Sequence, residues 1–255
     1  LNSIPDVKVR SSLWNSIWDG SLWAVMFGFG ENYIVPFLFY FNATVFQSSL
    51  VQGASQFSLG IGQLIGAKIL LFLKNRKTLV QTMVFLHGSL WILLFFITWK
   101  TRNPWIGMIL FCSGILASNI GSPAWASWMN DLVPPRQRGT FWSNRNRVIG
   151  MVQFLSILSA GGILYLGKQK GHELTVFGIL FSLAALVRIS CLIPLSRQCE
   201  PEFRKPDREG EYHFYIFLSK LFTTNFGRFT LFVMGMNFSV QLSACLIPAY
   251  LLKVL

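Results

Sequence analysis

The residue best placed to do chemistry in this sequence is Glu31, a carboxylate deep inside a long apolar stretch. Of ten Asp and Glu residues, only Glu31 falls well within a predicted membrane segment, whereas Asp19 lies nearer the end of the same stretch. A carboxylate at membrane depth must face a cavity, pair with a cation or stay protonated. In a protein that exposes it to each side in turn, such a group can carry protons. The alternative is a protonated, hydrogen-bonded glutamate with a structural role.

Polar residues inside the same stretch and inside other apolar stretches extend this set. They are Asn32, Gln56, Asn119, Arg145, Asn237 and Gln241. Because lipid offers no hydrogen-bond partner, each must be satisfied by a neighbour, by water or by a ligand. We interpret them, with Glu31, as candidate substrate- or proton-binding residues, although interhelical hydrogen bonding is the commoner explanation for any one of them. Arg145 and Arg147 are candidate partners of Glu31, and their spacing places them on different helix faces, so at most one reaches a cavity.

Three further ionisable residues lie in apolar segments. Lys68 and Arg188 are close to predicted cytoplasmic helix ends, where long side chains can extend to the lipid headgroups. His87 has no second metal-ligating residue near it in the sequence. We therefore expect both cations to reach the headgroups, His87 to be structural, and the protein to hold no metal or cofactor.

Membrane helices are needed to position these residues. The chain is 53% hydrophobic and only 13% charged, with a mean hydropathy of +0.49, whereas soluble proteins are about 25% charged. Seven apolar segments are each long enough to cross about 30 Å of hydrocarbon. They lie near residues 14–41, 46–73, 78–99, 104–129, 141–166, 172–195 and 228–252. The sequence therefore predicts an all-α, polytopic membrane protein.

The positive charge of the chain is spread over short loops between these segments. The net charge is +12, but a nucleic-acid binder would gather its Lys and Arg residues on one water-facing patch. The lipid bilayer, and not a nucleic acid, is the expected anionic partner. Loops near residues 8–10, 74–77, 136–138 and 197–208 are richer in Lys and Arg than those near 100–102 and 168–170. The richer side is expected to be cytoplasmic, with the N-terminus inside and the protein in the plasma (inner) membrane.

The connection between the fourth and fifth segments has a distinctive pattern. It reads Asp131-Leu132-Val133-Pro134, followed by Arg138-Gly139. We hypothesise that Asp131, Arg138 and Gly139 form a conformational hinge in which the two charges pair as a clasp. A solvated turn is the alternative, and a surface ion pair there would stabilise the protein little.

This pattern resembles the loop between helices 4 and 5 of major facilitator superfamily transporters. Six apolar segments, a long charged loop and a seventh segment preceded by the stretch 225–229 are also similar to that family. The loop after Gly66, with its basic residues at 74–77, is similar to the family's best-known motif in place and charge, but it lacks that motif's Asp and second Gly.

The resemblance implies two six-helix halves with a substrate site near the membrane midplane between them. It implies a cavity lined by helices one, four and seven, which carry Glu31, Asn119 and Asn237. Residues 1–195 would then form a six-helix transporter half-bundle, 196–227 a cytoplasmic loop between halves, and 228–255 the first helix of a second half. We expect the chain to be a fragment of a longer protein, with five more helices after residue 255.

The expected function is secondary active transport of a small-molecule substrate by alternating access, with protons as a candidate coupling ion. A seven-helix receptor that binds without transport is the alternative, but its N-terminus would lie outside, against the loop charges. A membrane enzyme would need clustered His, Asp or Cys residues at membrane depth, and three scattered histidines do not provide them. No GxxxxGK[ST], GxSxG, HExxH or CxxC motif is present, so we do not expect an enzyme.

Overall fold

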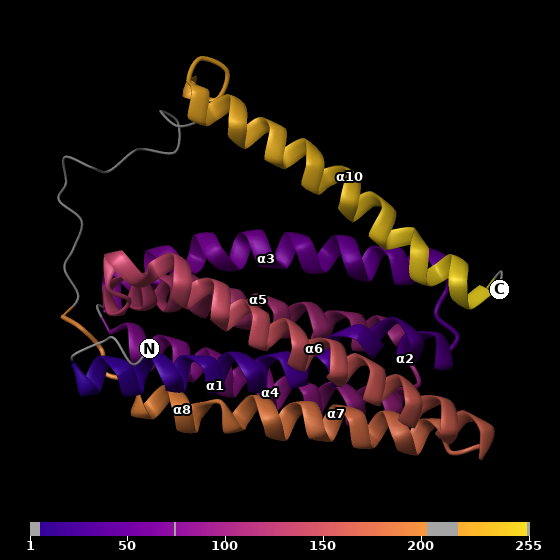
Figure 1. Ribbon diagram of the computed structural model, residues 1–255. Helices are drawn as coiled ribbons and strands as arrows, with labels where there is room; N and C mark the ends of the chain where they lie inside the picture. Colours follow the sequence, from indigo (N-terminus) through magenta and orange to yellow (C-terminus); the bar gives the residue numbers. More distant parts are fainter. Residues whose placement is uncertain (1–5, 74, 203–218, 254–255) are drawn as a thin grey trace. The chain divides into compact units, whose positions relative to one another are not determined.

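The protein is built from helices. The computed structural model describes residues 6–73, 75–202 and 219–253, and these residues contain no β-strand (Figure 1). Six helical stretches are long and apolar enough to cross a membrane: Val7–Tyr40, Val45–Leu73, Arg76–Thr101, Pro104–Leu132, Pro135–Gln169 and Glu173–Arg197. By this criterion the predictions of an all-α integral membrane protein and of the first six segments are confirmed.

Three of the six spans are uninterrupted and three contain a break. The uninterrupted spans are α3 (Val45–Leu73), α4 (Arg76–Thr101) and α5 (Pro104–Leu132). The first span consists of α1 (Val7–Phe29), η1 (Glu31–Tyr33) and α2 (Ile34–Tyr40). In the fifth, η2 (Pro135–Gln137) leads into α6 (Arg138–Gln169), and in the sixth α7 (Glu173–Ser190) leads into α8 (Leu192–Arg197).

Polar loop residues determine where three of these spans begin. The side chains of Asp6, Asn75 and Asn103 each accept a hydrogen bond from backbone N–H groups in the first turn of the helix that follows. Such caps satisfy N–H groups that have no partner inside a helix. The short loops therefore contribute to the stability of the spans as well as connecting them.

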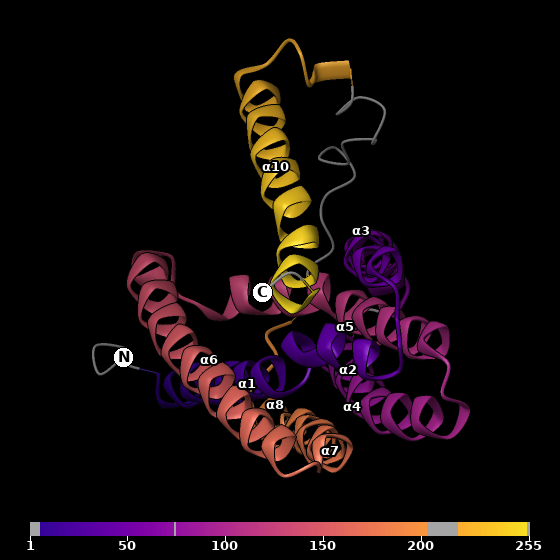
Figure 2. The same cartoon turned by 90° about the vertical axis from the view of Figure 1, so that its right-hand side faces the viewer.

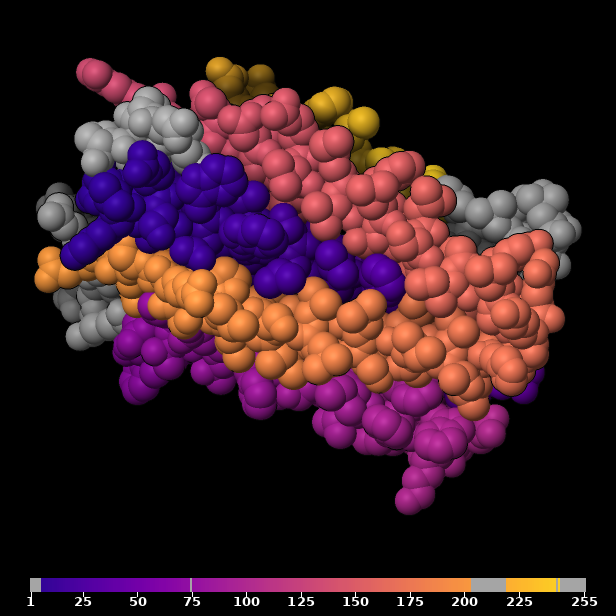
Figure 3. Space-filling model, turned by 60° about the horizontal axis from the view of Figure 1, so that its bottom comes forward, coloured from indigo at the N-terminus to yellow at the C-terminus, as the bar shows by residue number. Residues whose placement is uncertain are grey.

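The six spans of the first unit pack as two groups of three. Helices α3 and α4 both pack on α5, and α6 and α7 both pack on α1. Contacts between α4 and α7 join the groups, and Figure 3 shows α7 between α4 and α1, with α6 beyond α1. Helices α3 and α6 lie at opposite edges (Figure 2). In each of their spans, only 17% of the residues in the apolar membrane-crossing segment are buried. The first span thus joins the fifth and sixth, a pairing that chain order does not predict.

The chain divides into two compact units, Leu1–Phe203 and Arg204–Leu255. In the second unit, α10 (Asn225–Lys253) is a continuous helix of 29 residues over the predicted seventh segment. Residues 203–218 of the predicted inter-half loop lie outside the described residues. The crossing of the membrane by α10 and the division into transporter halves therefore stay predictions.

Two glycines allow α3 to pack closely on α5. A Cβ atom on Gly62 would lie 2.9 Å from the Asn119 Cβ and from the Leu116 carbonyl oxygen. A Cβ atom on Gly66 would overlap the carbonyl group of Ile120. Small residues permit this approach of two backbones, which is a main source of helix association in membranes.

Aromatic side chains fill the core around the break in the first span. The ring of Phe37 on α2 lies 5.4 and 4.9 Å, between centroids, from Phe177 and Phe181 on α7. Trp91 on α4 lies 5.2 Å from Phe181. The backbone at Gly30 approaches Trp91 so closely that a Cβ atom there would lie 2.9 Å from the indole ring. This packing fixes the position of the break between α1 and α2.

Candidate functional site

Apart from Arg76 at the start of α4, three charged side chains, each from a different span, are buried among the described residues of the first unit. Asp19 on α1, Arg145 on α6 and Arg188 on α7 are 7%, 8% and 7% exposed. We call them the central charge cluster. Removing an ion from water is costly unless partners compensate, and charges inside membrane helices usually mark functional sites. The cluster is therefore the strongest candidate for a functional site among the described residues.

Arg145 connects α6 to two other helices. Its Nε donates a 3.3 Å hydrogen bond to the backbone oxygen of Ser16 on α1, and its guanidinium lies 4.7 Å from the ring centre of Trp125 on α5. The same guanidinium lies 5.6 Å from the ring centre of Trp142 on α6. Cation–π contacts stabilise a guanidinium that has lost water. Asp19 also interacts with it electrostatically, so Arg145 has a backbone oxygen, two aromatic rings and a carboxylate as partners within the protein.

Arg188 has fewer direct partners. Its Nη2 donates a long hydrogen bond of 3.4 Å to the Ser118 hydroxyl, in the middle of α5, and its side chain also interacts with the Cys191 thiol. Its buried Nε has no hydrogen-bond partner. Among the described residues, both salt bridges within 4.0 Å belong to Arg76, so no carboxylate there lies that close to Arg188. Asp19 and Glu31 act on it over longer distances. Because a guanidinium carries five N–H donors, Arg188 keeps unused hydrogen-bonding capacity.

Asp19 supplies negative charge to both arginines. It interacts electrostatically with Arg188 and, less strongly, with Arg145. Its backbone oxygen receives a 3.8 Å contact from the thiol of Cys191, at the junction of α7 and α8. With two guanidinium groups and one carboxylate, the central charge cluster has one positive charge in excess.

The break in the first span places Glu31 beside the cluster. Glu31 is half-buried on η1, and Arg188 is the cation with which it interacts. Asn32 is exposed, and its amide donates a 3.2 Å hydrogen bond to the backbone oxygen of Phe27. The Tyr33 hydroxyl donates a 2.7 Å bond to the backbone oxygen of Ile157 and so ties the break to α6. The polar break is therefore held between α1 and α6.

A small apolar hollow lies between α4 and α5. It is lined by His87, Leu90, Trp91, Leu94, Leu110, Phe111 and Gly114. The Nδ1 atom of His87 and the Nε1 atom of Trp91 are buried without a hydrogen-bond partner. His87 also interacts electrostatically with Arg188. The structural role expected for His87 stays a prediction.

The other predicted site residues are not part of the cluster. Gln56 is exposed on α3. Asn119 is half-buried, and its amide donates a 2.9 Å hydrogen bond to the backbone oxygen of Ile115 within α5. Asn237 is exposed and Gln241 half-buried on α10, in the second unit. The structure thus brings Glu31 and Arg145 to one region and leaves Gln56 outside it.

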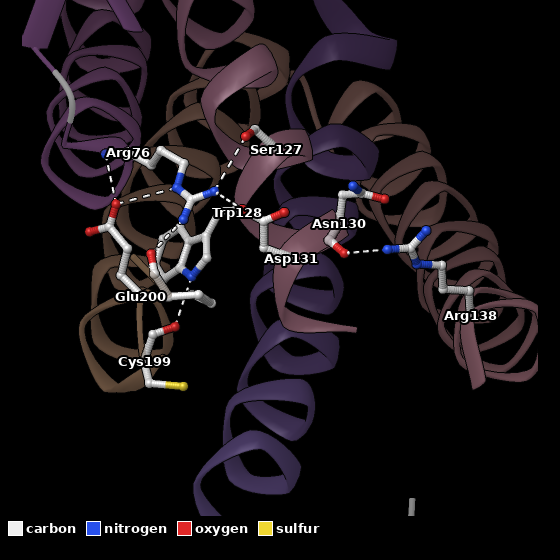
Figure 4. Close-up of polar contacts among 9 residues, drawn as sticks. Arg76, Ser127, Trp128, Asn130, Asp131, Arg138, Cys199 and Glu200 are labelled. Carbon is white, nitrogen blue, oxygen red and sulfur yellow. Dashed lines mark hydrogen bonds and ion pairs between the residues drawn. The ribbon is translucent and has the colours of Figure 1, made fainter. Parts of the chain in front are cut away.

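A second polar cluster lies where α4 begins and α5 ends (Figure 4). Arg76 has no exposed surface, and its guanidinium donates to the Asp131 carboxylate at 2.5 Å and to the Ser127 hydroxyl at 3.3 Å. It also donates to the Glu200 carboxylate at 3.5 Å and to the Pro201 backbone oxygen at 2.5 Å. We call these five residues the Arg76 clamp. The clamp ties α4, α5 and the segment after α8 together.

Neighbouring contacts hold the segment after α8 in the same place. The indole Nε1 of Trp128 donates a 2.8 Å hydrogen bond to the backbone oxygen of Cys199, and the Cys199 N–H donates a 2.9 Å bond to the Ser12 hydroxyl. The Lys77 ammonium donates a 3.0 Å bond to the backbone oxygen of Gln198. This segment is thus fixed to α1, α4 and α5 at one end of the first unit.

The predicted clasp between Asp131 and Arg138 is wrong. Asp131 pairs with Arg76, while Arg138 donates to the backbone oxygen of Asn130 at 2.9 Å (Figure 4). Arg138 also donates to the backbone oxygen of Val133 at 3.4 Å. Arg138 therefore caps the last carbonyl groups of α5, which have no partner within the helix. Gly139 is exposed, and a Cβ atom there would meet open space.

The expectation that Arg188 extends to the headgroups is also wrong, because its side chain is buried. Lys68, by contrast, is exposed. In the sequence, the opposite charges of Asp19 and Arg188 in two apolar segments are the signal that could indicate their interaction inside the protein.

The expectation that Arg145 and Arg147 lie on different faces of their helix is confirmed, since Arg145 is buried and Arg147 is exposed.

Searches of protein-family models, of curated proteins and of solved structures give no match to this chain. The likeness to the major facilitator superfamily therefore stays a resemblance carried by short motifs. The function has to be argued from the central charge cluster and from the packing around it.

Proposed function

We propose that this protein is a secondary active transporter that moves a small solute across the membrane by alternating access. The observation that carries the proposal is the central charge cluster, in which three ionisable side chains from three apolar spans are buried together. Such residues are rare inside membranes and line substrate or ion pathways where they occur. Arg188 meets Ser118 in the middle of α5, near the depth at which transporters bind their solutes.

The two groups of three helices provide parts that could move against each other. Arg145 belongs to one group and stacks on Trp125 of the other. The Arg76 clamp joins α4, α5 and the segment after α8 at one end. We propose that the clamp closes this end of the solute pathway in one state and loosens in the other.

The loop charges support a cytoplasmic location for the clamp and the N-terminus, in the plasma (inner) membrane. We propose a small-molecule substrate and the lipid bilayer as partners, and neither nucleic-acid binding nor enzyme activity. Single cysteines at residues 100–103 and 168–171 should react with an impermeant maleimide added to intact cells, and cysteines at 75–77 should not. The reverse pattern would overturn the orientation.

Glu31 is the proposed proton carrier, because it lies at a helix break and interacts with Arg188. In the full-length protein, Glu31→Gln should abolish accumulation driven by a proton gradient and preserve exchange of labelled for unlabelled solute. The exposed carboxylate Glu202 gives a control, since Glu202→Gln should change neither. Proton-driven accumulation that persists in Glu31→Gln would assign coupling to another residue.

Transport itself can be tested in proteoliposomes that contain the full-length protein. A panel of labelled anionic, neutral and cationic solutes should yield at least one that enters faster than in empty liposomes. Arg145→Gln should slow this uptake by about tenfold or more, since it removes a charge at the site, whereas Arg147→Gln, at an exposed position, should not. Binding of a solute without any uptake or exchange would favour the receptor alternative.

A further inference from the structure

We propose that Arg188 binds an anionic oxygen group of the transported solute, so that the substrate is a carboxylate or a phosphate compound. This inference rests on the proposed function, because it names the substrate class of the same site. It arises from a contrast within the central charge cluster: Arg145 has a backbone oxygen and two aromatic rings as direct partners, whereas Arg188 has an unused donor.

The unused donors of Arg188 determine the chemistry of its partner. The Nε–H is buried without an acceptor, and the Nη2–H reaches the Ser118 hydroxyl at 3.4 Å. The Arg188 side chain also interacts with the Cys191 thiol, which is only a weak acceptor. The planar guanidinium presents parallel N–H groups that match two oxygens of one carboxylate or phosphate. Buried polar groups are normally hydrogen-bonded, and the exceptions require an explanation. An oxyanion bound at Arg188 would satisfy these donors.

The protein's own carboxylates do not take this place. Asp19 and Glu31 interact with Arg188 electrostatically, but neither forms a salt bridge with it within 4.0 Å. Asp19 also serves Arg145. While Glu31 carries the proton proposed above, the two arginines and Asp19 leave one positive charge in excess, so an incoming anion would be attracted and would neutralise it.

Arg145 is a poorer candidate for the same role. Its Nε already donates to the backbone oxygen of Ser16, and its guanidinium faces the rings of Trp125 and Trp142. Arg188 instead has the Ser118 hydroxyl beside it, which can donate a hydrogen bond to an oxyanion. The specificity for an anion is therefore assigned to Arg188 and Ser118.

A free solute and a lipid headgroup could both supply the oxyanion. Arg188 is only 7% exposed, and its partner Ser118 lies in the middle of a membrane-spanning helix. A headgroup phosphate lies at the membrane surface, so this depth favours a free solute.

The test is thermal unfolding of the full-length protein in neutral detergent, followed by tryptophan fluorescence. The probes are succinate, acetate and inorganic phosphate, compared with succinamide, acetamide and sodium chloride at equal ionic strength. A ligand that binds only the folded state raises the unfolding temperature in a saturable way. At least one oxyanion should do so, and its neutral amide or the chloride control should not.

Variants then assign the effect to Arg188. Arg188→Gln should weaken the apparent affinity for that oxyanion by about 10- to 100-fold, as expected for loss of charge-assisted hydrogen bonds. Arg188→Lys should lose less, Ser118→Ala should lose less still, and Arg147→Gln should match the unchanged protein. Should Arg188→Gln fail to fold, Arg188→Lys and Ser118→Ala carry the test.

Each outcome decides one claim. The assignment of Arg188 to an anionic solute is wrong if no oxyanion raises the unfolding temperature, or if the rise is unchanged in Arg188→Gln. It is also wrong if the rise occurs only when phosphatidylglycerol is added to the detergent. If an oxyanion binds through Arg188 but proteoliposomes show no uptake or exchange, transport fails and the binding site stands. If only neutral or cationic solutes are transported, independently of Arg188, transport stands and the substrate class is wrong.

Discussion

Arg76 and Arg188 are both buried, Arg76 at the first residue of α4 and Arg188 within α7, yet their surroundings differ. Arg76 contacts two carboxylates, a hydroxyl and a backbone oxygen, so its charge and its donors are both satisfied. Arg188 has a long hydrogen bond to Ser118, a weak partner in the Cys191 thiol, a buried Nε–H without a partner and carboxylates only at longer distance. The first arrangement suits an ion that holds helices together, and the second suits an ion that receives a ligand.

The two arginines also differ in where they lie along the helices. The Arg76 clamp is made of short, direct contacts at a helix end, where water and loops supply partners. The central charge cluster lies among apolar spans, where an unsatisfied donor is costly. Natural proteins retain such costs where function needs them. Comparing variants of the two arginines tests this interpretation.

The largest effect on stability is expected at Arg76. Arg76→Gln should lower the free energy of unfolding by about 2–4 kcal/mol, because Asp131 and Glu200 lose their common cation and three segments lose their link. Equilibrium unfolding in mixed micelles, followed by tryptophan fluorescence, measures this change. Arg136→Gln, an exposed cation near the same helix end, should cost no more than about 0.5 kcal/mol. Equal costs for the two variants would show that the clamp does not hold the helices.

A smaller effect is expected within the clamp at Asp131. A double-mutant cycle should give a coupling of about 1 kcal/mol between Arg76 and Asp131, since the Asp131 side chain is 42% exposed. The coupling between Asp131 and Arg138 should be near zero. Exchanging the charges of Asp131 and Arg138 should therefore not restore what Asp131→Asn loses, and a full rescue would reinstate the clasp that the structure does not show.

The smallest effect is expected at Arg188 in the absence of solute. Arg188→Gln should change the free energy of unfolding by less than about 1 kcal/mol in either direction, because it removes unsatisfied donors but deprives Asp19 of one counter-charge. The same unfolding measurement applies. A loss as large as that of Arg76→Gln would make Arg188 a structural ion and would remove the distinction between the two regions.

Local patterns in the sequence predict the spans well and the partners of charged residues poorly. Apolar length is enough to place six spans, and helical spacing correctly separates the faces of Arg145 and Arg147. The partner of Asp131, however, is 55 residues earlier in the chain, while the nearer Arg138 caps a helix end. Which helix packs on which is decided by tertiary contacts that no local pattern contains.

The candidate site shows the same limit. Glu31 and Arg145 stand out in the sequence as polar residues in apolar segments, and the structure places both around the central charge cluster. The position of Arg188 along its segment suggested that its side chain could reach the headgroups, but packing of α7 against α1 and α4 buries it. Asp19 and Arg188 come together only because the first and sixth spans are neighbours in space.

Alternating access requires that solute reach the central charge cluster from each side of the membrane in turn. It is tested most directly by Ser118→Cys in a full-length variant that lacks Cys112, Cys191, Cys199 and Cys245. A charged, impermeant methanethiosulfonate should label the cysteine at position 118 in both right-side-out and inside-out vesicles. The control is Ile109→Cys on the same helix, where the native side chain is 59% exposed. This cysteine is expected to face lipid and to stay unlabelled. We expect labelling of Ser118→Cys from both sides. Labelling from one side only, or from neither, would contradict alternating access.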